Sequence, residues 1–178
     1  MVVTKEKIVE IPEGVEVSID NGRVKAKSGD TVIEKDFVSK EIEIKVDNGK
    51  ITIKPLIDKR NAYSKVTTVA SIIKSMLEGA SGKEYEYKLE IVYSHFPITV
   101  AVKGKELEIA NLRGAKKARS ATIRGNTKVE VKGKNITVKS NDKQHAGQTA
   151  ANLENATKLS NTDRRIFQDG IYITKKAK

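Results

Sequence analysis

The sequence predicts an α+β protein built from two tandem, duplicated modules, each a short antiparallel sheet with one helix packed on it. Two observations predict this class: each half combines strand-like alternation with one helical stretch, and the pattern of the first half returns in the second. Ile-Thr-Ile-Lys at residues 51–54 returns as Ile-Thr-Val-Lys at residues 136–139, an offset of 85 residues. This period is typical of a duplicated small domain and too long for a solenoid repeat.

Two hairpins are predicted in the first half. Residues 15–28 alternate apolar and polar side chains around Asn21-Gly22, and residues 42–54 do so around Asp47-Asn48-Gly49. An Asn-Gly pair between alternating runs is a strong hairpin signal because both turn positions require a positive φ.

A helix is predicted after the second hairpin. Its apolar residues recur at three- and four-residue spacing and therefore share one face that packs on the sheet. They are Val66, Val69, Ile72, Ile73, Met76 and Leu77. Gly79 and Gly82 are expected to end this helix, and residues 84–93 to form a strand that closes the first module.

The second half repeats this order with a thinner helical stripe. Hairpins are predicted at residues 98–109 and 127–139, and either Asn141 or Asp142 is placed to cap the helix that follows. The apolar stripe of this helix consists of Ala146, Ala150, Leu153, either Ala156 or Thr157, and Leu159. Residues 170–174 are expected to form the closing strand.

The boundary between the modules is predicted between residues 94 and 95. Pro97 favours this position because a proline interrupts continuous strand pairing. The chain is therefore divided into an N-terminal α+β module, residues 1–94, and a basic C-terminal α+β module, residues 95–178.

Positive charge is concentrated in the second module. The chain has a formal net charge of +11, and residues 98–140 hold eleven Lys and Arg residues against three Glu. The excess is densest at residues 111–119, Asn-Leu-Arg-Gly-Ala-Lys-Lys-Ala-Arg, where no acid is near. A cationic loop of this kind fits a polyanion, most often a phosphate backbone, although the alternative is an ordinary solvated loop. The candidate contacts are Arg113, Lys116, Lys117 and Arg119.

A second basic set lies in Asp-Arg-Arg-Ile-Phe-Gln-Asp-Gly-Ile-Tyr at residues 163–172. Arg164 and Arg165 are the candidate contacts there, because guanidinium groups bind phosphates bidentately. Phe167 and Tyr172 fit two roles, a contact beside the arginines or the more common one, core packing under the helix. With three Phe, five Tyr and no Trp, a platform that stacks successive unpaired bases is poorly supported.

Catalytic and cofactor signals are weak. The chain has no Cys, and its two histidines, His95 and His145, lack metal-ligand spacing. Ser81-Gly82-Lys83 lacks the upstream Gly of a phosphate-binding loop, and Glu84 stands where Ser or Thr would hold magnesium. No catalytic residue, metal site or cofactor is therefore predicted. Because no run of about 18 apolar residues and no apolar signal core occurs, we expect a cytoplasmic protein without a membrane partner.

Three segments are distinctive when read together. They are Tyr-Ser-His-Phe-Pro-Ile at residues 93–98, Glu-Ile-Ala-Asn-Leu-Arg-Gly at residues 108–114, and Asp-Arg-Arg-Ile-Phe-Gln-Asp-Gly-Ile-Tyr-Ile at residues 163–173. Jointly they resemble the large ribosomal subunit protein six family, in its archaeal and eukaryotic form. A duplicated α+β module is also the architecture of that family, so the resemblance covers essentially the whole chain.

The resemblance implies a non-enzymatic protein of the cytoplasmic ribosome that binds large-subunit ribosomal RNA near the sarcin-ricin loop and the base of the factor-binding stalk. The C-terminal module would make much of this contact, with neighbouring ribosomal proteins as further partners and translation factors nearby. The bacterial branch carries a Lys-Gly-Lys-Gly loop where this chain has residues 164–170, so its contacts do not transfer. RNA contact is assigned only to Arg113, Lys116, Lys117, Arg119, Arg164 and Arg165. A free-standing RNA-binding regulator is the alternative function.

Overall fold

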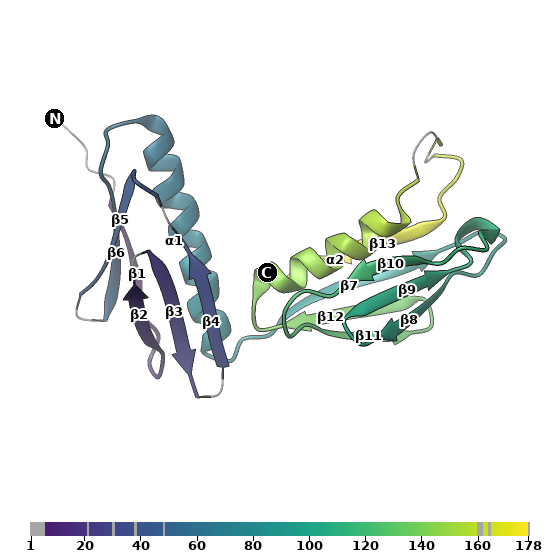
Figure 1. Cartoon of the computed structure of the whole chain (residues 1–178), viewed down its shortest axis with the longest axis horizontal. Coiled ribbons are helices and arrows are strands. Elements are labelled where there is room, and N and C mark those ends of the chain that lie inside the picture. The colour runs from purple at the N-terminus through teal and green to yellow at the C-terminus, as the bar shows by residue number, and fades with distance from the viewer. Residues whose placement is uncertain are drawn as a thin grey trace. The chain divides into compact units, whose positions relative to one another are not determined.

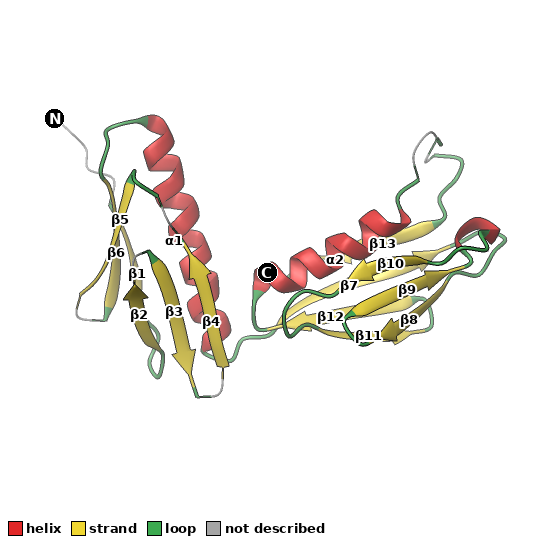
Figure 2. Ribbon diagram, in the orientation of Figure 1, coloured by secondary structure: helices red, strands yellow, loops and turns green. Residues whose placement is uncertain are grey.

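The computed structural model describes residues 6–20, 22–29, 31–37, 39–47, 49–159, 162–163 and 165–177. The chain divides into two compact units, Met1–Lys83 and Glu84–Lys178, whose elements are labelled in Figure 1. Each unit combines antiparallel sheets with one α-helix among its described residues (Figure 2). This confirms the predicted α+β class.

The first unit contains two three-stranded antiparallel sheets, ordered β1-β6-β5 and β2-β3-β4, and the helix α1. Its elements are β1 (Lys7–Glu10), β2 (Glu16–Asp20), β3 (Arg23–Ser28), β4 (Thr31–Asp36), β5 (Ile42–Asp47), β6 (Lys50–Pro55) and α1 (Arg60–Ala80). Both predicted hairpins are confirmed, as β2-β3 and β5-β6. Gly22 and Gly49 have φ values of 83° and 79° in the two turns, while Asn21 and Asn48 lie outside the described residues.

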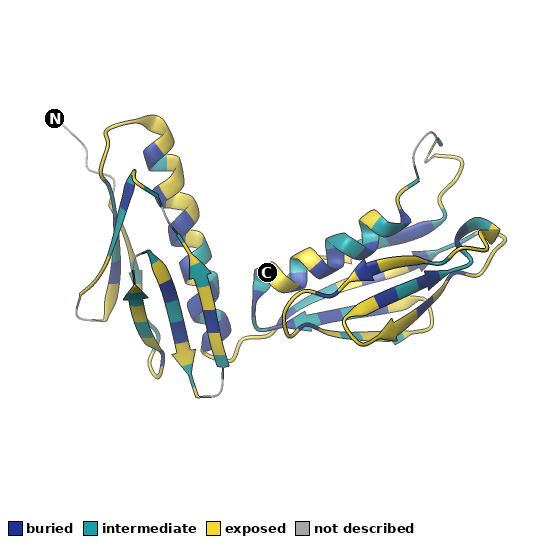
Figure 3. Cartoon of the chain, in the orientation of Figure 1, coloured by how far each residue is buried: buried dark blue, intermediate teal, exposed yellow. Residues whose placement is uncertain are grey.

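The helix α1 packs its apolar stripe on the core of the first unit, and the dark blue band along it in Figure 3 marks this face. The buried members of the stripe are Val66, Val69, Ile73, Met76 and Leu77. Ile72 is only half-buried. Gly79 lies inside the last turn of α1, contrary to the prediction that it stops the helix, because burial of the surrounding residues offsets the modest cost of one helical glycine. Gly82 follows the helix with a φ of 101°.

The second unit contains a three-stranded sheet, β10-β9-β8, a four-stranded sheet, β11-β12-β7-β13, and the helix α2. Its elements are β7 (Tyr85–Val92), β8 (Thr99–Lys103), β9 (Glu106–Ala110), the 3-10 turn η1 (Leu112–Gly114), β10 (Arg119–Thr122), β11 (Lys128–Lys132), β12 (Asn135–Ser140), α2 (Lys143–Thr157) and β13 (Gly170–Lys175). The predicted hairpins are confirmed as β8-β9 and β11-β12.

Asp142 caps the start of α2, where its carboxylate accepts a hydrogen bond from the Gln144 backbone N–H at 2.9 Å. Of the two alternatives for the helical stripe, Thr157 is buried and Ala156 is half-buried. Leu159 lies beyond the end of α2 but still packs against the core of the second unit. The predicted face of this helix is therefore largely confirmed, with its final apolar residue outside the helix.

The two units share one topology. The order β1-β6-β5 corresponds to β7-β12-β11, and β2-β3-β4 corresponds to β8-β9-β10. Ile51 lies opposite Val9, as Ile136 lies opposite Leu89. Even a hydrogen bond beyond the ladder recurs, from Ile11 N–H to the Gly49 carbonyl at 3.0 Å and from Ile91 N–H to the Lys134 carbonyl at 2.7 Å. The predicted equivalence of the strands that contain Ile51 and Ile136 is thus confirmed.

The boundary predicted between residues 94 and 95 is wrong, because the two units divide between Lys83 and Glu84. Strand β7 lies between β12 and β13 and buries Tyr85, Leu89 and Ile91, so it opens the second unit instead of closing the first. A strand that follows a helix has the same alternation whichever sheet it joins. Its side-chain pattern therefore predicted the strand correctly but not the unit to which it belongs.

Candidate nucleic-acid interface

Three loops meet at one end of the second unit, which Figure 1 shows on the right. They are residues 93–98 after β7, residues 111–119 after β9, of which Arg119 is already the first residue of β10, and residues 158–169 after α2. Hydrogen bonds join them: the Asn111 side-chain amide donates to the Pro97 carbonyl at 3.0 Å, and the Ser94 N–H donates to the Asp169 carboxylate at 2.7 Å. We call the described residues of these three loops the tip.

The backbone of the loop 111–119 is strained. Asn111 and Arg113 have φ values of 60° and 53°, and they are the two non-glycine residues with positive φ in the described part of the chain. Between them Leu112 is only 4% exposed and anchors the loop in the core of the second unit. Unfavourable backbone conformations of this kind persist where packing enforces them, and they cluster at functional sites.

The strained loop brings the two predicted basic sets together. The Arg113 guanidinium carbon lies 4.5 Å from the centroid of the Phe167 ring, a cation–π contact between loops that are distant in the sequence. Phe167 is 42% exposed, so the more common role considered for it, core packing, is wrong. Tyr172 is half-buried, and its hydroxyl donates to the Gln168 carbonyl at 3.0 Å.

Arg119 has a structural task that the sequence did not indicate. Its guanidinium Nη1 donates to the carbonyls of Ala156 at 2.9 Å and Lys158 at 3.3 Å. These carbonyls belong to the C-terminal end of α2, where unpaired acceptors and the negative end of the helix dipole favour a cation. Arg119 therefore ties the loop 111–119 to α2, and part of its hydrogen-bonding capacity is already used.

Lys116 and Lys117 are exposed, and within the described structure neither makes an ion pair or a side-chain hydrogen bond. The acids of the tip are engaged instead. Asp163 binds the Arg165 guanidinium at 3.0 Å and accepts from the Arg165 N–H at 2.9 Å, and these contacts lower the pKa of Asp163 below its ordinary value. Within the described residues, the tip thus presents the unpaired cations Lys116 and Lys117 beside Asp163, whose charge is paired with Arg165, and Asp169, which accepts from the Ser94 N–H. Arg164 lies outside the described residues.

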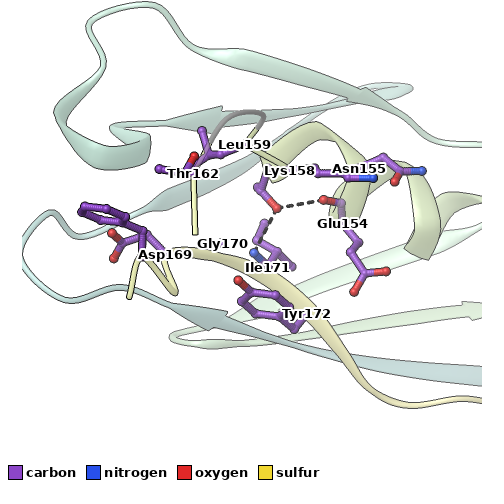
Figure 4. A pocket seen from close by; sticks show the side chains of 11 residues that line it. Glu154, Asn155, Lys158, Leu159, Thr162, Asp169, Gly170, Ile171 and Tyr172 are labelled. Atoms are coloured by element: carbon purple, nitrogen blue, oxygen red, sulfur yellow. Dashed lines mark hydrogen bonds between the residues drawn. The ribbon is translucent and has the colours of Figure 1, made fainter. Parts of the chain in front are cut away.

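A pocket of about 210 Å³ lies beside the tip, between the end of α2 and the start of β13 (Figure 4). The Thr157 hydroxyl donates to the Glu154 carbonyl at 3.0 Å and accepts from the Ile171 N–H at 3.0 Å. Asp169, another lining residue, is held by Ser94. Thr157 therefore joins α2 to β13, and Asp169 joins the loop after α2 to the loop after β7, so neither is a free group directed into the pocket.

The two histidines lie in different parts of the second unit. His145 Nδ1 is 3.3 Å from the Asp142 carboxylate at the start of α2, whereas His95 is an exposed residue of the tip. Among the described residues no group of three or more His, Asp or Glu is arranged to hold a metal ion. Neither of the described α-helices is long and apolar enough to span a membrane.

Comparison with known proteins identifies the family. The family model described as Ribosomal protein L6 matches residues 96–170. The large ribosomal subunit protein uL6 of Methanocella arvoryzae is 41% identical over 178 residues, which cover 99% of this chain and 100% of that protein. The corresponding proteins of Sulfurisphaera tokodaii and Methanosarcina mazei are each 43% identical, over 94% and 96% of this chain and 90% and 97% of their own lengths. This chain belongs to the uL6 family.

The segments that carry the resemblance to the uL6 family are also those that meet at the tip. Residues 93–98, 108–114 and 163–173 are far apart in the sequence, yet the contacts from Asn111, Ser94 and Arg113 join them. One exposed residue of the tip was missed as a candidate. Phe96 is 50% exposed, and its ring carbons lie 3.3 Å from where a β-carbon on Gly114 would be. Only its place within a family segment could have drawn attention to it.

Proposed function

We propose that the tip binds large-subunit ribosomal RNA through the phosphate backbone. Membership of the uL6 family makes the chain a structural protein of the large ribosomal subunit, acting in translation in the cytoplasm. The observation on which the proposal rests is which charged side chains of the tip have partners and which do not. Among the described residues Lys116 and Lys117 have no acidic partner, whereas Asp163 and Asp169 are both held by other groups of the tip. A surface of unpaired cations attracts phosphates and releases their counterions.

The charge of each unit also supports RNA contact by the second unit. In the sequence of the second unit nineteen Lys and Arg residues face ten acids, whereas the first unit has fifteen against thirteen. Contacts from Lys116, Lys117, Arg113 and Arg165 would recognise the shape and backbone of folded RNA more than its base sequence. Arg119 contributes mainly by holding the loop in place.

The finer location follows the family resemblance. The tip would lie near the sarcin-ricin loop and the base of the factor-binding stalk, with neighbouring ribosomal proteins in contact. The nearly balanced first unit would then face those proteins or visiting translation factors. Crosslinking between the protein and large-subunit RNA tests this location, and crosslinks confined to other RNA regions would exclude it.

The decisive experiment changes Lys116 and Lys117 together to Gln. Binding to large-subunit RNA should weaken, and the slope of log affinity against log salt should flatten by roughly 1.4 to 1.8 units, from about 0.7 to 0.9 per phosphate contact. Thermal stability should hardly change, because exposed charges contribute little to folding. Lys27→Gln with Lys74→Gln is the matched control, since both residues are exposed and lie in the first unit.

Equal effects of the two double variants would mean that total charge matters and the tip does not. Release of the wild-type protein from large subunits by a high-salt wash would instead favour the alternative, a free-standing RNA-binding regulator. A protein held by many simultaneous phosphate contacts should remain bound in the same wash.

A further inference from the structure

The tip carries two exposed aromatic rings among its cations. Of the three Phe residues of the chain, Phe37 packs against the core of the first unit. Phe96 and Phe167 are 50% and 42% exposed, and both lie at the tip. Exposing a Phe ring to water is unfavourable, and two on one small surface indicate a partner that covers them.

Both rings are held by the strained loop. Phe96 lies against Gly114, which has a φ of 75° and where an added β-carbon would be 3.3 Å from the ring, and Phe167 lies under the Arg113 guanidinium. Because Arg113 and Gly114 are consecutive, the two rings flank the same point of the loop. Rings fixed before binding lose little conformational entropy when a partner stacks on them.

The charges around the rings indicate the chemistry of that partner. Lys116 and Lys117 lie in the same loop and have no acidic partner in the part of the chain that the structure describes, and Arg165 lies two residues before Phe167. An apolar protein surface would have no electrostatic attraction to these cations. A nucleotide would satisfy both features, because its base stacks on an aromatic ring and its phosphate attracts lysine and arginine.

We propose that Phe96 and Phe167 form a stacking site for one or two unpaired bases of RNA, with the flanking phosphates on Lys116 and Lys117. This rests on the proposed RNA-binding function of the tip and specifies the RNA feature bound: a bulge, loop or strand end, where bases are free to stack on side chains. The scarcity of aromatic residues argues against a platform for many successive bases. Two rings are enough for a bulged nucleotide.

The test uses the full chain and two RNA hairpins of equal length and charge, one with a bulged 2-aminopurine and the other fully paired. The wild-type protein should prefer the bulged hairpin and quench its fluorescence. Phe96→Leu with Phe167→Leu keeps apolar bulk but removes the π faces. It should weaken binding of the bulged hairpin by roughly 5- to 150-fold per lost stack and change binding of the paired hairpin far less, because Lys116 and Lys117 are unaltered. Phe96→Tyr with Phe167→Tyr is the matched control and should retain the preference.

Three results would overturn the stacking site. The first is equal binding of both hairpins by the wild-type protein, and the second is a Leu variant that keeps the wild-type preference. The third is a Leu variant that binds both hairpins normally but no longer joins large subunits. The last result would mean that a ribosomal protein covers the rings. The Lys116 and Lys117 variant separates this outcome from failure of the proposed function: if it still weakens binding of both hairpins, only the stacking site is wrong. If it too has no effect, both proposals fail.

Discussion

Arg119 and Lys117 show that neighbouring cations of one loop have different roles. Lys117 is exposed and has no partner within the described structure, whereas the Arg119 guanidinium donates to the carbonyls of Ala156 and Lys158 at the end of α2. In the sequence both are basic residues of the same glycine-containing run. Only the approach of α2 distinguishes the binding candidate from the residue that holds the loop.

Replacing Arg119 with Gln should therefore reduce the free energy of unfolding by about 1 kcal/mol, because the α2 carbonyls lose a charged donor. Urea denaturation of the full chain measures the change, with Lys117→Gln as the control that should leave stability unaltered. Equal stability of the two variants would mean that the Arg119 contact contributes nothing in solution.

Asp163 should limit the RNA affinity of the tip. Hydrogen bonds from the Arg165 side chain and then from its backbone N–H lower the pKa of Asp163, so the pair is present above the ordinary pKa of Asp and is lost as pH falls through the lowered value. Asp163→Asn removes the negative charge and releases Arg165. RNA binding should tighten, and the salt slope should steepen by up to about 0.9 units.

NMR titration of the Asp163 carboxylate in the free protein should give a pKa below its ordinary value. Unchanged affinity and slope in the Asn variant would exclude Arg165 from the RNA contact, and an ordinary pKa would show that the pair does not persist in solution.

The helix α1 illustrates how far a periodic pattern predicts packing. Its stripe was predicted from three- and four-residue spacing, and five of its six members are buried. The exception, Ile72, lies at the margin of the buried face. The glycines predict the end of the helix less well, because Gly79 lies within the last turn and, of the two, only Gly82 adopts a backbone conformation that ends a helix.

Ile73→Ala should lower the stability of the first unit by roughly 2–5 kcal/mol, because the fully buried side chain leaves a cavity. Ile72→Ala, at the neighbouring half-buried position, should cost less. RNA affinity of the Ile73 variant should match that of the wild-type protein, measured under conditions where the second unit stays folded. Parallel losses of stability and affinity would show that the two units unfold cooperatively.

The division at Lys83 and Glu84 makes β7 essential to the second unit, since it is an interior strand between β12 and β13. A fragment of residues 84–178 should fold and retain RNA binding. A fragment of residues 95–178 lacks Tyr85, Leu89 and Ile91 and should not fold. Circular dichroism and amide NMR spectra distinguish the two, and a folded 95–178 fragment would restore the boundary predicted from the sequence.

Local patterns were sufficient for much of this protein. Alternation, helical spacing and Asn-Gly turns act over a few residues, so the four hairpins, both helices and the duplication could be predicted from the chain. The strands β1, β4 and β10 were not predicted. The exposure of Lys116 and Lys117 followed from their charge. The sheet that β7 joins, the role of Arg119 and the exposure of Phe167 could not be predicted, because they depend on long-range contacts. Ser94 meets Asp169 across 75 residues, and Arg119 meets Ala156 across 37. No local sequence pattern predicts these contacts, because the packing of the complete second unit decides which loops lie together at one end of it.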